Sequence, residues 1–149
     1  MTRVLMVCLG NICRSPLAEG ILRSKLPSPD YFIDSAGTGN YHVGSPPDPR
    51  SIEVARKHNL DISYQRARQF SIQDFDKFDH IFVMDRSNFQ NVVKQARHDN
   101  DIAKVKKILD FLDDEQLIDV PDPYHDNDEG FEQVFQLLDS ACLVVSKSI

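Results

Sequence analysis

The stretch VLMVCLGNICRSP, Val4–Pro16, decides the fold of this chain. Its first four residues form a short apolar run that is typical of a buried strand. Ser15 is placed to cap a helix, and Pro16 suits the first helical turn. Apolar residues then recur at helical spacing, at Leu17, Ala18, Ile21, Leu22 and Leu26. The stretch therefore predicts a strand, a tight loop and a helix in direct succession, which is the beginning of a parallel α/β sheet.

The loop at residues 8–15 combines a thiol with features that bind anions. It lies between the carboxyl end of a strand and the amino end of a helix, where open α/β folds bind phosphate groups. The helix dipole, unpaired backbone N–H groups and the Arg14 guanidinium all favour the thiolate of Cys8. Arg14 also carries a planar fork that matches two phosphate oxygens. We interpret this loop, called the phosphate loop below, as a phosphate site with its own nucleophile. The simpler alternatives are that Cys8 is a core residue and that Arg14 is a surface charge.

Residues 7–16, VCLGNICRSP, resemble the signature of the low-molecular-weight protein tyrosine phosphatases. The resemblance covers nearly the whole chain and implies an enzyme without a cofactor. Such an enzyme hydrolyses phosphotyrosine in proteins, or small aryl phosphates, through a cysteinyl-phosphate intermediate. In this family the loop cysteine is the nucleophile and the loop arginine binds phosphate, so the resemblance gives these roles to Cys8 and Arg14.

The rest of the chain predicts one α/β domain, residues 1–149. Strands alternating with helices predict a doubly wound, four-stranded parallel sheet with helices on both faces, and the resemblance implies the strand order 2-1-3-4. Ser87 or Asn88 is expected to cap the fourth helical segment. The expected segments are strands at 31–33, 80–84 and 105–109, a loop at 34–39, helices from about 50 to 59, at 89–96 and at 131–145, a helical turn near 71–74 and an acidic loop at 113–129.

Composition excludes several other classes of protein. The net charge of −6 argues against a nucleic-acid partner, since no basic patch is evident in the sequence. The apolar run at 4–7 is too short for a signal peptide or a membrane span, so we expect a cytoplasmic protein without membrane contact. We also expect a monomer or weak dimer. Three cysteines and scattered histidines form neither a disulfide framework nor a metal site. Cys142 lies on an apolar helical stripe and is expected in the core.

Asp122 is the expected proton donor. Hydrolysis of an aryl phosphate needs an acid near the phosphate loop, and Pro121 and Pro123 restrict the backbone on both sides of Asp122. The residues alone only place Asp122 among 23 acidic side chains. Asp122-Pro123-Tyr124 matches the family's Asp-Pro-Tyr motif, which implies that Asp122 is the general acid of the first step and the base of the second.

Four further residues are expected to shape the loop. Gly10 permits close approach of the backbone to phosphate, and Asn11 can hold an unusual loop conformation. Ser15 can donate a hydrogen bond to the Cys8 sulfur, or can simply cap the helix. Ser35 matches a serine of the family's supporting network.

The expected pocket walls are apolar and aromatic. Tyr41 and Tyr124 match positions that line the family's cleft, where a phosphotyrosine ring can stack, and Leu9 adds a further wall. Ile12 favours phosphotyrosine, because relatives that act on phosphoarginine tend to have threonine there. His125 stands where many relatives have a second tyrosine, and it could make substrate binding depend on pH near 6 to 7.

Two other positions carry specific expectations. Gln65 stands where family members commonly have a histidine, so a hydrogen bond can survive but a proton-linked role cannot. Cys13 matches a loop cysteine that can pair with the nucleophile under oxidation, which would switch catalysis off reversibly; its alternative is a packed thiol.

Two other functions remain open at this stage. Arsenate reduction on the same fold needs further cysteines near residues 75–90, and the chain has none there. A phosphoprotein-binding module without turnover would not need Cys8, Arg14, Ser15 and Asp122 together. Turnover of p-nitrophenyl phosphate distinguishes the enzyme from the binding module.

Overall fold

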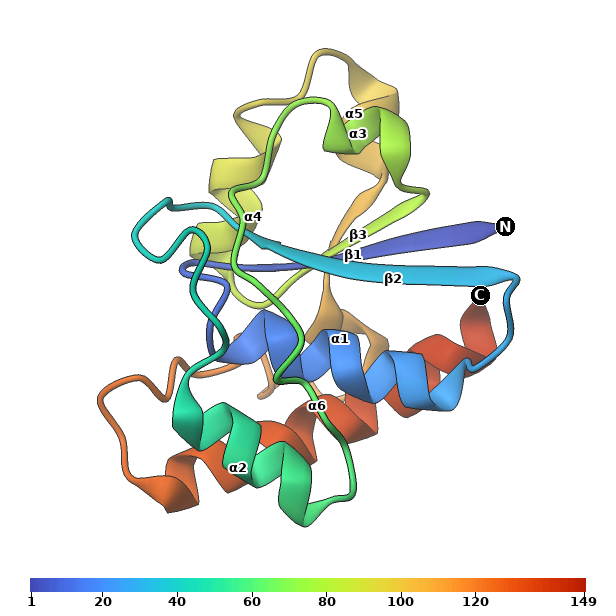
Figure 1. Ribbon diagram of the computed structural model, residues 1–149. Coiled ribbons are helices and arrows are strands. Elements are labelled where there is room, and N and C mark those ends of the chain that lie inside the picture. Colours follow the sequence, from blue (N-terminus) through green and yellow to red (C-terminus); the bar gives the residue numbers. More distant parts are fainter.

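Strand β1, Thr2–Cys8, is an inner strand of a four-stranded parallel sheet. The computed structural model describes all residues, 1–149, and Figure 1 shows the sheet between two groups of helices. The strand order is β2-β1-β3-β4 with every pairing parallel, so the predicted fold and order are confirmed. In chain order the other elements are α1 (Arg14–Lys25), β2 (Tyr31–Gly37), α2 (Pro49–Lys57), α3 (Asp74–Lys77), β3 (His80–Val83), α4 (Arg86–Val93), α5 (Asp99–Ala103), β4 (Val105–Lys107), a 3-10 turn (Ile108–Phe111) and α6 (Asp128–Ser148).

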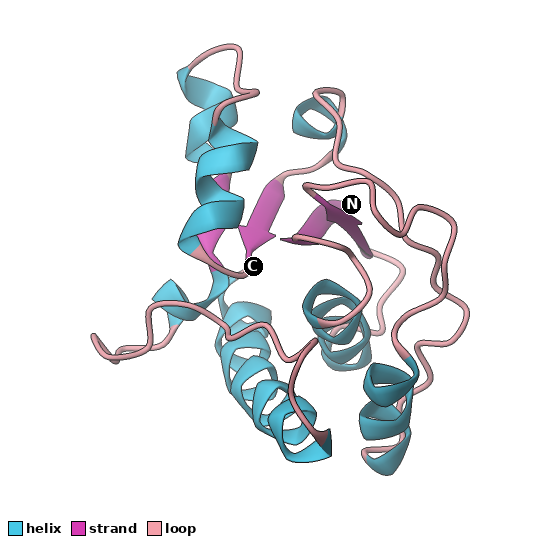
Figure 2. Cartoon of the chain, turned by 90° about the vertical axis from the view of Figure 1, so that its left-hand side faces the viewer, coloured by secondary structure: helices cyan, strands magenta, loops and turns pink.

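The apolar run of β1 is continuous because both faces of the sheet are covered. Val4 and Met6 belong to the larger core cluster, beneath α1 and α6, whereas Leu5 and Val7 belong to a second cluster on the opposite face. All four side chains are completely buried. Side chains alternate between the faces of a strand, so a run buried on both faces loses the polar alternation of a half-exposed strand. The strands form one layer with helices to either side (Figure 2).

The end of β2 lies beside the phosphate loop. Residues 34–37 were expected in a loop, but β2 continues to Gly37, which pairs with Cys8. The carbonyls of Cys8 and Leu9 accept hydrogen bonds from the next two amides, Thr38 and Gly39. A Cβ on Gly37 would lie 2.7 Å from the Leu9 carbonyl oxygen, so the close approach of β2 to the phosphate loop needs glycine at this position. Small residues therefore mark a close approach here, rather than the end of the strand.

Two predicted helix caps are wrong. Helix α4 is capped by Asp85, whose carboxylate accepts from the Asn88 amide at 2.7 Å while the Asn88 side chain accepts from the Asp85 amide at 3.2 Å. Asn88 is thus the reciprocal partner of the cap, and Ser87 lies inside the helix. Helix α1 already begins at Arg14, so Ser15 lies in its first turn and is free for another contact.

Other boundaries shift because local patterns do not fix helix ends. The turn expected at 71–74 forms at α3, the strand expected at 105–109 ends at Lys107 and continues as a 3-10 turn, and α5 was not predicted. The C-terminal helix has the predicted apolar face, and Cys142 is completely buried, as expected. No helix of the chain has the length and apolar character that crossing a bilayer requires.

Helix α1 provides a test of this packing. Replacing glycine by alanine inside a helix usually stabilises it by about 1 kcal/mol. At Gly20 the new Cβ would lie 2.5 Å from Ile62 Cγ2, and Ile62 is completely buried. We expect Gly20→Ala to lower the free energy of unfolding by about 1–3 kcal/mol in urea titration, because the core is overpacked.

The control is Ser24→Ala on the exposed face of the same helix. It should change the free energy of unfolding by no more than about 0.5 kcal/mol. A Gly20→Ala protein more stable than the wild type would contradict this packing.

Candidate active site

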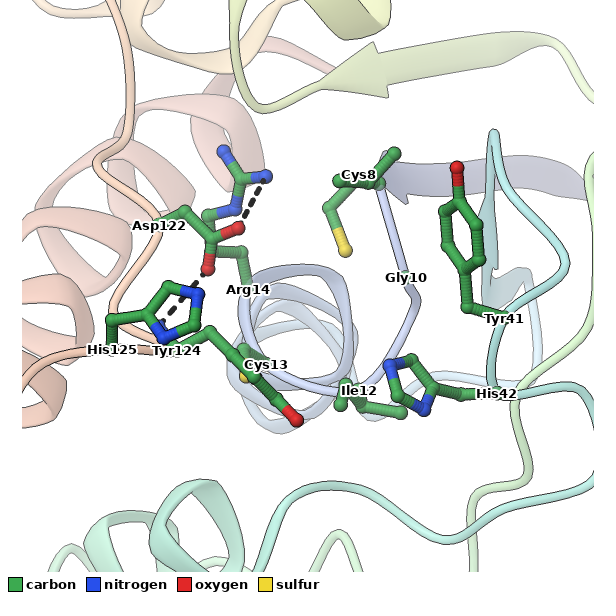
Figure 3. A pocket seen from close by; sticks show the side chains of 11 residues that line it. Cys8, Gly10, Ile12, Cys13, Arg14, Tyr41, His42, Asp122, Tyr124 and His125 are labelled. Atoms are coloured by element: carbon green, nitrogen blue, oxygen red, sulfur yellow. Dashed lines mark hydrogen bonds and ion pairs between the residues drawn. The ribbon is translucent and has the colours of Figure 1, made fainter.

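A pocket of about 220 Å³ opens at the carboxyl end of β1 (Figure 3). The structure brings ten of the predicted site residues to it and adds His42. The predicted residues that line it are Cys8, Leu9, Gly10, Ile12, Cys13, Arg14, Tyr41, Asp122, Tyr124 and His125. The other three, Asn11, Ser15 and Ser35, are buried behind it. The phosphate loop, the segment after β2 and the acidic loop thus meet at one edge of the sheet.

The Cys8 sulfur accepts two hydrogen bonds in this pocket. The Asn11 amide donates to it at 3.2 Å, and the Ser15 hydroxyl lies 3.1 Å away. The Asn11 side chain donates to the same Ser15 oxygen at 2.8 Å, so the single Ser15 proton is free to point at the sulfur. The sulfur is thus contacted by one group of the phosphate loop and one of the first turn of α1.

Asn11 holds the loop in an unusual conformation. Its φ of 57° lies in the left-handed region, as the sequence suggested. The side-chain amide donates to Ser15 and, at 3.0 Å, to Ser35, while its oxygen accepts from the Arg68 amide at 3.1 Å. The backbone donor of Arg68 fixes which end of the Asn11 amide is oxygen. Every polar atom of this side chain therefore supports the loop.

A buried carboxyl extends this network away from the pocket. Glu19 is 3% exposed and accepts from the Ser35 hydroxyl at 2.8 Å and the Tyr64 hydroxyl at 3.2 Å. Burial raises the pKa of Glu19 to about 7, although the Ser35 hydrogen bond and the charge of Arg23 act in the opposite direction. Sequence reasoning missed Glu19. The available signal was its spacing, one helical turn after Ser15.

Arg14 is fixed from two sides. It is 2% exposed, and its Nη1 donates to Asp85 at 2.6 Å and to the Val120 carbonyl at 3.0 Å. Burial opposes its charge, but Cys8 and Asp85 outweigh that effect and raise the pKa of Arg14 above its ordinary value. Asp85 was also missed. It directly follows the apolar strand 80–84, and the ends of parallel strands meet at one edge, so its position was a usable signal.

Asp122 lies beside Arg14 on the same side of the pocket (Figure 3). One carboxylate oxygen lies 3.7 Å from Arg14 Nη2, and the other accepts from the Tyr124 amide at 3.1 Å. The side chain is 44% exposed, so it can exchange protons with solvent. The segment just before it is attached to the sheet, because the Val120 amide donates to the Met84 carbonyl at 2.8 Å.

Aromatic rings form the mouth of the pocket. Tyr41 and Tyr124 are 73% and 41% exposed. His42 lies 6.2 Å from the Tyr124 ring, centroid to centroid, and His125 lies 5.0 Å from it, edge to face. His42 was not predicted as a site residue; it stands beside Tyr41 in a turn-rich segment, and that adjacency was the only signal. No group of three or more His, Cys, Asp or Glu side chains is placed to hold a metal ion.

The chain is similar to known proteins over nearly its whole length. Residues 3–149 match the family model of the low molecular weight phosphotyrosine protein phosphatases. The chain belongs to this family. A phosphatase of that name from Dictyostelium discoideum is 42% identical over 95% of this chain and 89% of its own length. The low molecular weight protein-tyrosine-phosphatase YfkJ from Bacillus subtilis is 41% identical over 100% of this chain and 96% of its own length.

Solved structures of other phosphatases have the same fold. The crystal structure of YfkJ superimposes with a TM-score of 0.92 at 42% identity, over 100% of this chain and 94% of that chain. A protein tyrosine phosphatase from Entamoeba histolytica, with Hepes in its active site, has a TM-score of 0.92 at 34% identity, over 97% and 94%. The chain is therefore a low molecular weight protein tyrosine phosphatase.

Cys13, the second cysteine of the phosphate loop, is a buried thiol. Cys13 is 4% exposed, and burial, followed by the charge of Asp48, raises the pKa of its thiol to about 12. It is therefore a neutral thiol at ordinary pH. All three cysteines are free in the structure, and the Cys8–Cys13 disulfide stays a prediction.

Gln65 replaces the expected histidine only in part. Its side-chain amide donates to the Pro16 carbonyl at 3.0 Å and so supports the first turn of α1. Its oxygen is buried without a hydrogen-bond partner. A hydrogen bond to the phosphate-loop region thus survives the replacement, as the sequence suggested.

The buried Glu19 of this phosphatase predicts a pH-dependent stability. The folded-state pKa of about 7 lies above the ordinary 4.5, so the folded protein binds the proton more tightly than the unfolded chain. This contribution to stability is present below pH 4.5 and is lost as the pH rises through 7. We expect Glu19→Gln to gain stability relative to the wild type by on the order of 3 kcal/mol between pH 4.5 and 8, in urea titrations.

Glu53→Gln on the exposed side of α2 is the matched control, and its stability difference from the wild type should stay nearly constant over the same range. If the stability difference between Glu19→Gln and the wild type also stayed constant between pH 4.5 and 8, the Glu19 carboxyl would be charged over this whole range, which would contradict the prediction.

Proposed function

We propose that the chain hydrolyses phosphotyrosine monoesters in two steps through a cysteinyl-phosphate intermediate. The observation that carries this proposal is that Cys8, Arg14 and Asp122 line one pocket of about 220 Å³. A nucleophile, an oxyanion site and a proton donor are the three functions that the reaction requires.

In the first step the Cys8 sulfur attacks phosphorus in line with the leaving oxygen. The S–P bond forms while the P–O bond to the aryl group breaks, and Asp122 donates its proton to the leaving phenolate. Arg14 and the loop amides bind the equatorial oxygens, where negative charge accumulates. The charged hydrogen bond to Asp85 keeps the Arg14 fork at a fixed angle during this step.

In the second step water attacks the phosphorus of the intermediate. Asp122, now a carboxylate, accepts a proton from the water, and the S–P bond breaks to release inorganic phosphate. The sulfur leaves as a thiolate. The Ser15 hydroxyl, 3.1 Å away, and the Asn11 amide, 3.2 Å away, stabilise its charge as it leaves.

The shape of the pocket favours an aryl phosphate as substrate. Cys8 is only 2% exposed, at the bottom, whereas Tyr41 and Tyr124 stand at the mouth. A phosphotyrosine side chain is long enough to place its phosphate at the bottom while its ring contacts these walls. A related structure, Wzb of Vibrio vulnificus, is a complex with benzylphosphonate, which joins a phosphonate to a phenyl ring; it is 29% identical with a TM-score of 0.88.

Arsenate reduction gains no support from the structure. That chemistry needs a relay of accessible cysteines, and the third cysteine, Cys142, is completely buried. Burial raises the pKa of its thiol to about 12, so it is a poor nucleophile.

Cys8→Ser tests the nucleophile. The serine hydroxyl is not ionised at neutral pH, so turnover of p-nitrophenyl phosphate in reduced, metal-free buffer should fall to the background rate. Inorganic phosphate should still bind, because Arg14 and the loop amides remain, and calorimetric titration can measure this. Substantial turnover by the Cys8→Ser protein would sink the covalent mechanism.

Asp122→Asn tests the proton donor. Loss of a general acid slows such reactions by roughly 10²–10⁴-fold, and the effect on phosphotyrosine peptides should lie in this range. The control is Asp126→Asn, an acidic residue of the same loop that does not line the pocket. Full activity of Asp122→Asn on phosphotyrosine peptides would rule out the acid assignment.

A further inference from the structure

We propose that Arg50 is a positioning residue that holds the loop of the general acid, Asp122, over the phosphate loop. The inference rests on the proposed function, because it requires Asp122 to transfer a proton. Arg50 does not line the pocket and has no role in the chemistry described above.

The start of α2 is attached to the phosphate loop. The Asp48 amide donates to the Ile12 carbonyl at 2.8 Å, and the Ser51 hydroxyl donates to the Cys13 carbonyl at 3.3 Å. Both acceptors belong to the loop that carries Cys8. The first turn of α2 therefore has a fixed position relative to the nucleophile.

Asp48 in turn orients the Arg50 side chain. Its carboxylate accepts from Arg50 Nε at 3.0 Å and from Arg50 Nη2 at 3.0 Å, which is a two-point contact. The same carboxylate accepts from the Arg50 backbone amide at 2.9 Å and caps the helix. Partial burial opposes its charge, but the hydrogen bonds from Arg50 hold the pKa of Asp48 below its ordinary value.

The other edge of the Arg50 guanidinium faces the acidic loop that carries Asp122. Arg50 Nη2 donates to the Tyr124 carbonyl at 2.8 Å, and Nη1 donates to the Asp126 carbonyl at 2.9 Å. The guanidinium also lies over two rings, 4.5 Å from the centroid of Phe131 and 5.8 Å from that of Tyr124. A planar fork is needed for these contacts, since a lysine ammonium cannot reach acceptors on two sides at once.

These are the only hydrogen bonds that join residues 121–126 to the rest of the protein. The segment also has the long ion pair from Asp122 to Arg14 at 3.7 Å, and its other hydrogen bonds are internal. The Tyr124 amide holds the Asp122 carboxylate, while the Tyr124 carbonyl is held by Arg50. The Asp122 carboxylate is thus linked to the phosphate loop through Tyr124, Arg50 and Asp48.

Loss of the Arg50 fork should affect proton transfer and spare phosphate binding. Asp122 would no longer be aimed at the leaving oxygen, and a displacement near 1 Å can cost about 10²-fold in rate. Cys8 and Arg14 would keep their own contacts. A substrate with a poor leaving group needs the acid most, so its rate should fall most.

The experiment compares Arg50→Met and Arg50→Lys with the wild type on p-nitrophenyl phosphate, phenyl phosphate and phosphotyrosine. For both variants we expect kcat/KM to fall about tenfold to hundredfold on the two poorer leaving groups and clearly less on p-nitrophenyl phosphate. The inhibition constant of inorganic phosphate should change less than about twofold, because its site is intact. The lysine variant keeps the charge, so the comparison holds if the methionine variant unfolds.

A double-mutant cycle with Asp122→Asn tests whether the Arg50 substitutions slow the reaction through Asp122. If Arg50 acts through Asp122, the Arg50 substitutions should cause no further loss in the Asp122→Asn protein. Arg56→Met is the matched control, because Arg56 lies on the same helix and its only ion pair is with the exposed Glu53. It should leave all three substrates unchanged.

The outcomes separate the two proposals. If Asp122→Asn itself retains full activity, the acid assignment fails, and the inference fails with it. If Asp122→Asn is slow but the Arg50 variants lose rate equally on all substrates, or lose it again in the Asp122→Asn protein, only the inference is overturned. Weakened phosphate binding in the Arg50 variants would overturn it in the same way, since Arg50 would then support the whole pocket.

Discussion

The phosphate loop depends on one asparagine. Asn11 has a φ of 57°, a conformation that is costly for a residue with a side chain. Three hydrogen bonds of its side chain, with Ser15, Ser35 and the Arg68 amide, offset this conformational cost. The backbone amide of Asn11, in the same turn, donates to the Cys8 sulfur at 3.2 Å. The surroundings of the Cys8 sulfur are therefore set by the loop conformation as well as by the cysteine itself.

Burial has opposite outcomes for Arg14 and Glu19, two ionisable side chains near this loop. Arg14 and Glu19 are both nearly inaccessible, yet they behave differently. Arg14 has Asp85 within 2.6 Å and stays charged, whereas Glu19 is held mainly by neutral hydroxyls and its pKa rises to about 7. A buried charge is tolerated where an opposite charge compensates its desolvation. Arg14 thus keeps a charged guanidinium in the pocket, and Asp85 holds it there.

Much of the candidate site could be predicted because its chemistry is local. The loop Cys8–Ser15 carries the proposed nucleophile and the arginine in eight consecutive residues, and the flanking patterns predict a strand and a helix. Asp122 could be assigned only through the family motif, because acidic residues are numerous. Glu19, Asp85 and Arg50 were missed, since the contacts that bring them to the site are with Ser35, Arg14 and Tyr124, and each of these partners lies at least 16 residues away in the sequence. The caps of α1 and α4 were misplaced for a similar reason: Ser15 is used by Cys8, and Asp85 serves both a cap and Arg14.

The sequence by itself determined most of the alternation of strands and helices along the chain and the position of the phosphate loop with its cysteine and arginine. These follow from apolar periodicity and from residues that are adjacent in the chain, so short-range physics is sufficient. Only the tertiary structure decided how Asp122 reaches the loop and what holds it there. Its distance from Cys8 in the chain is closed by the parallel sheet and by α2, and the hydrogen bonds of Arg50 exist only once those elements have packed.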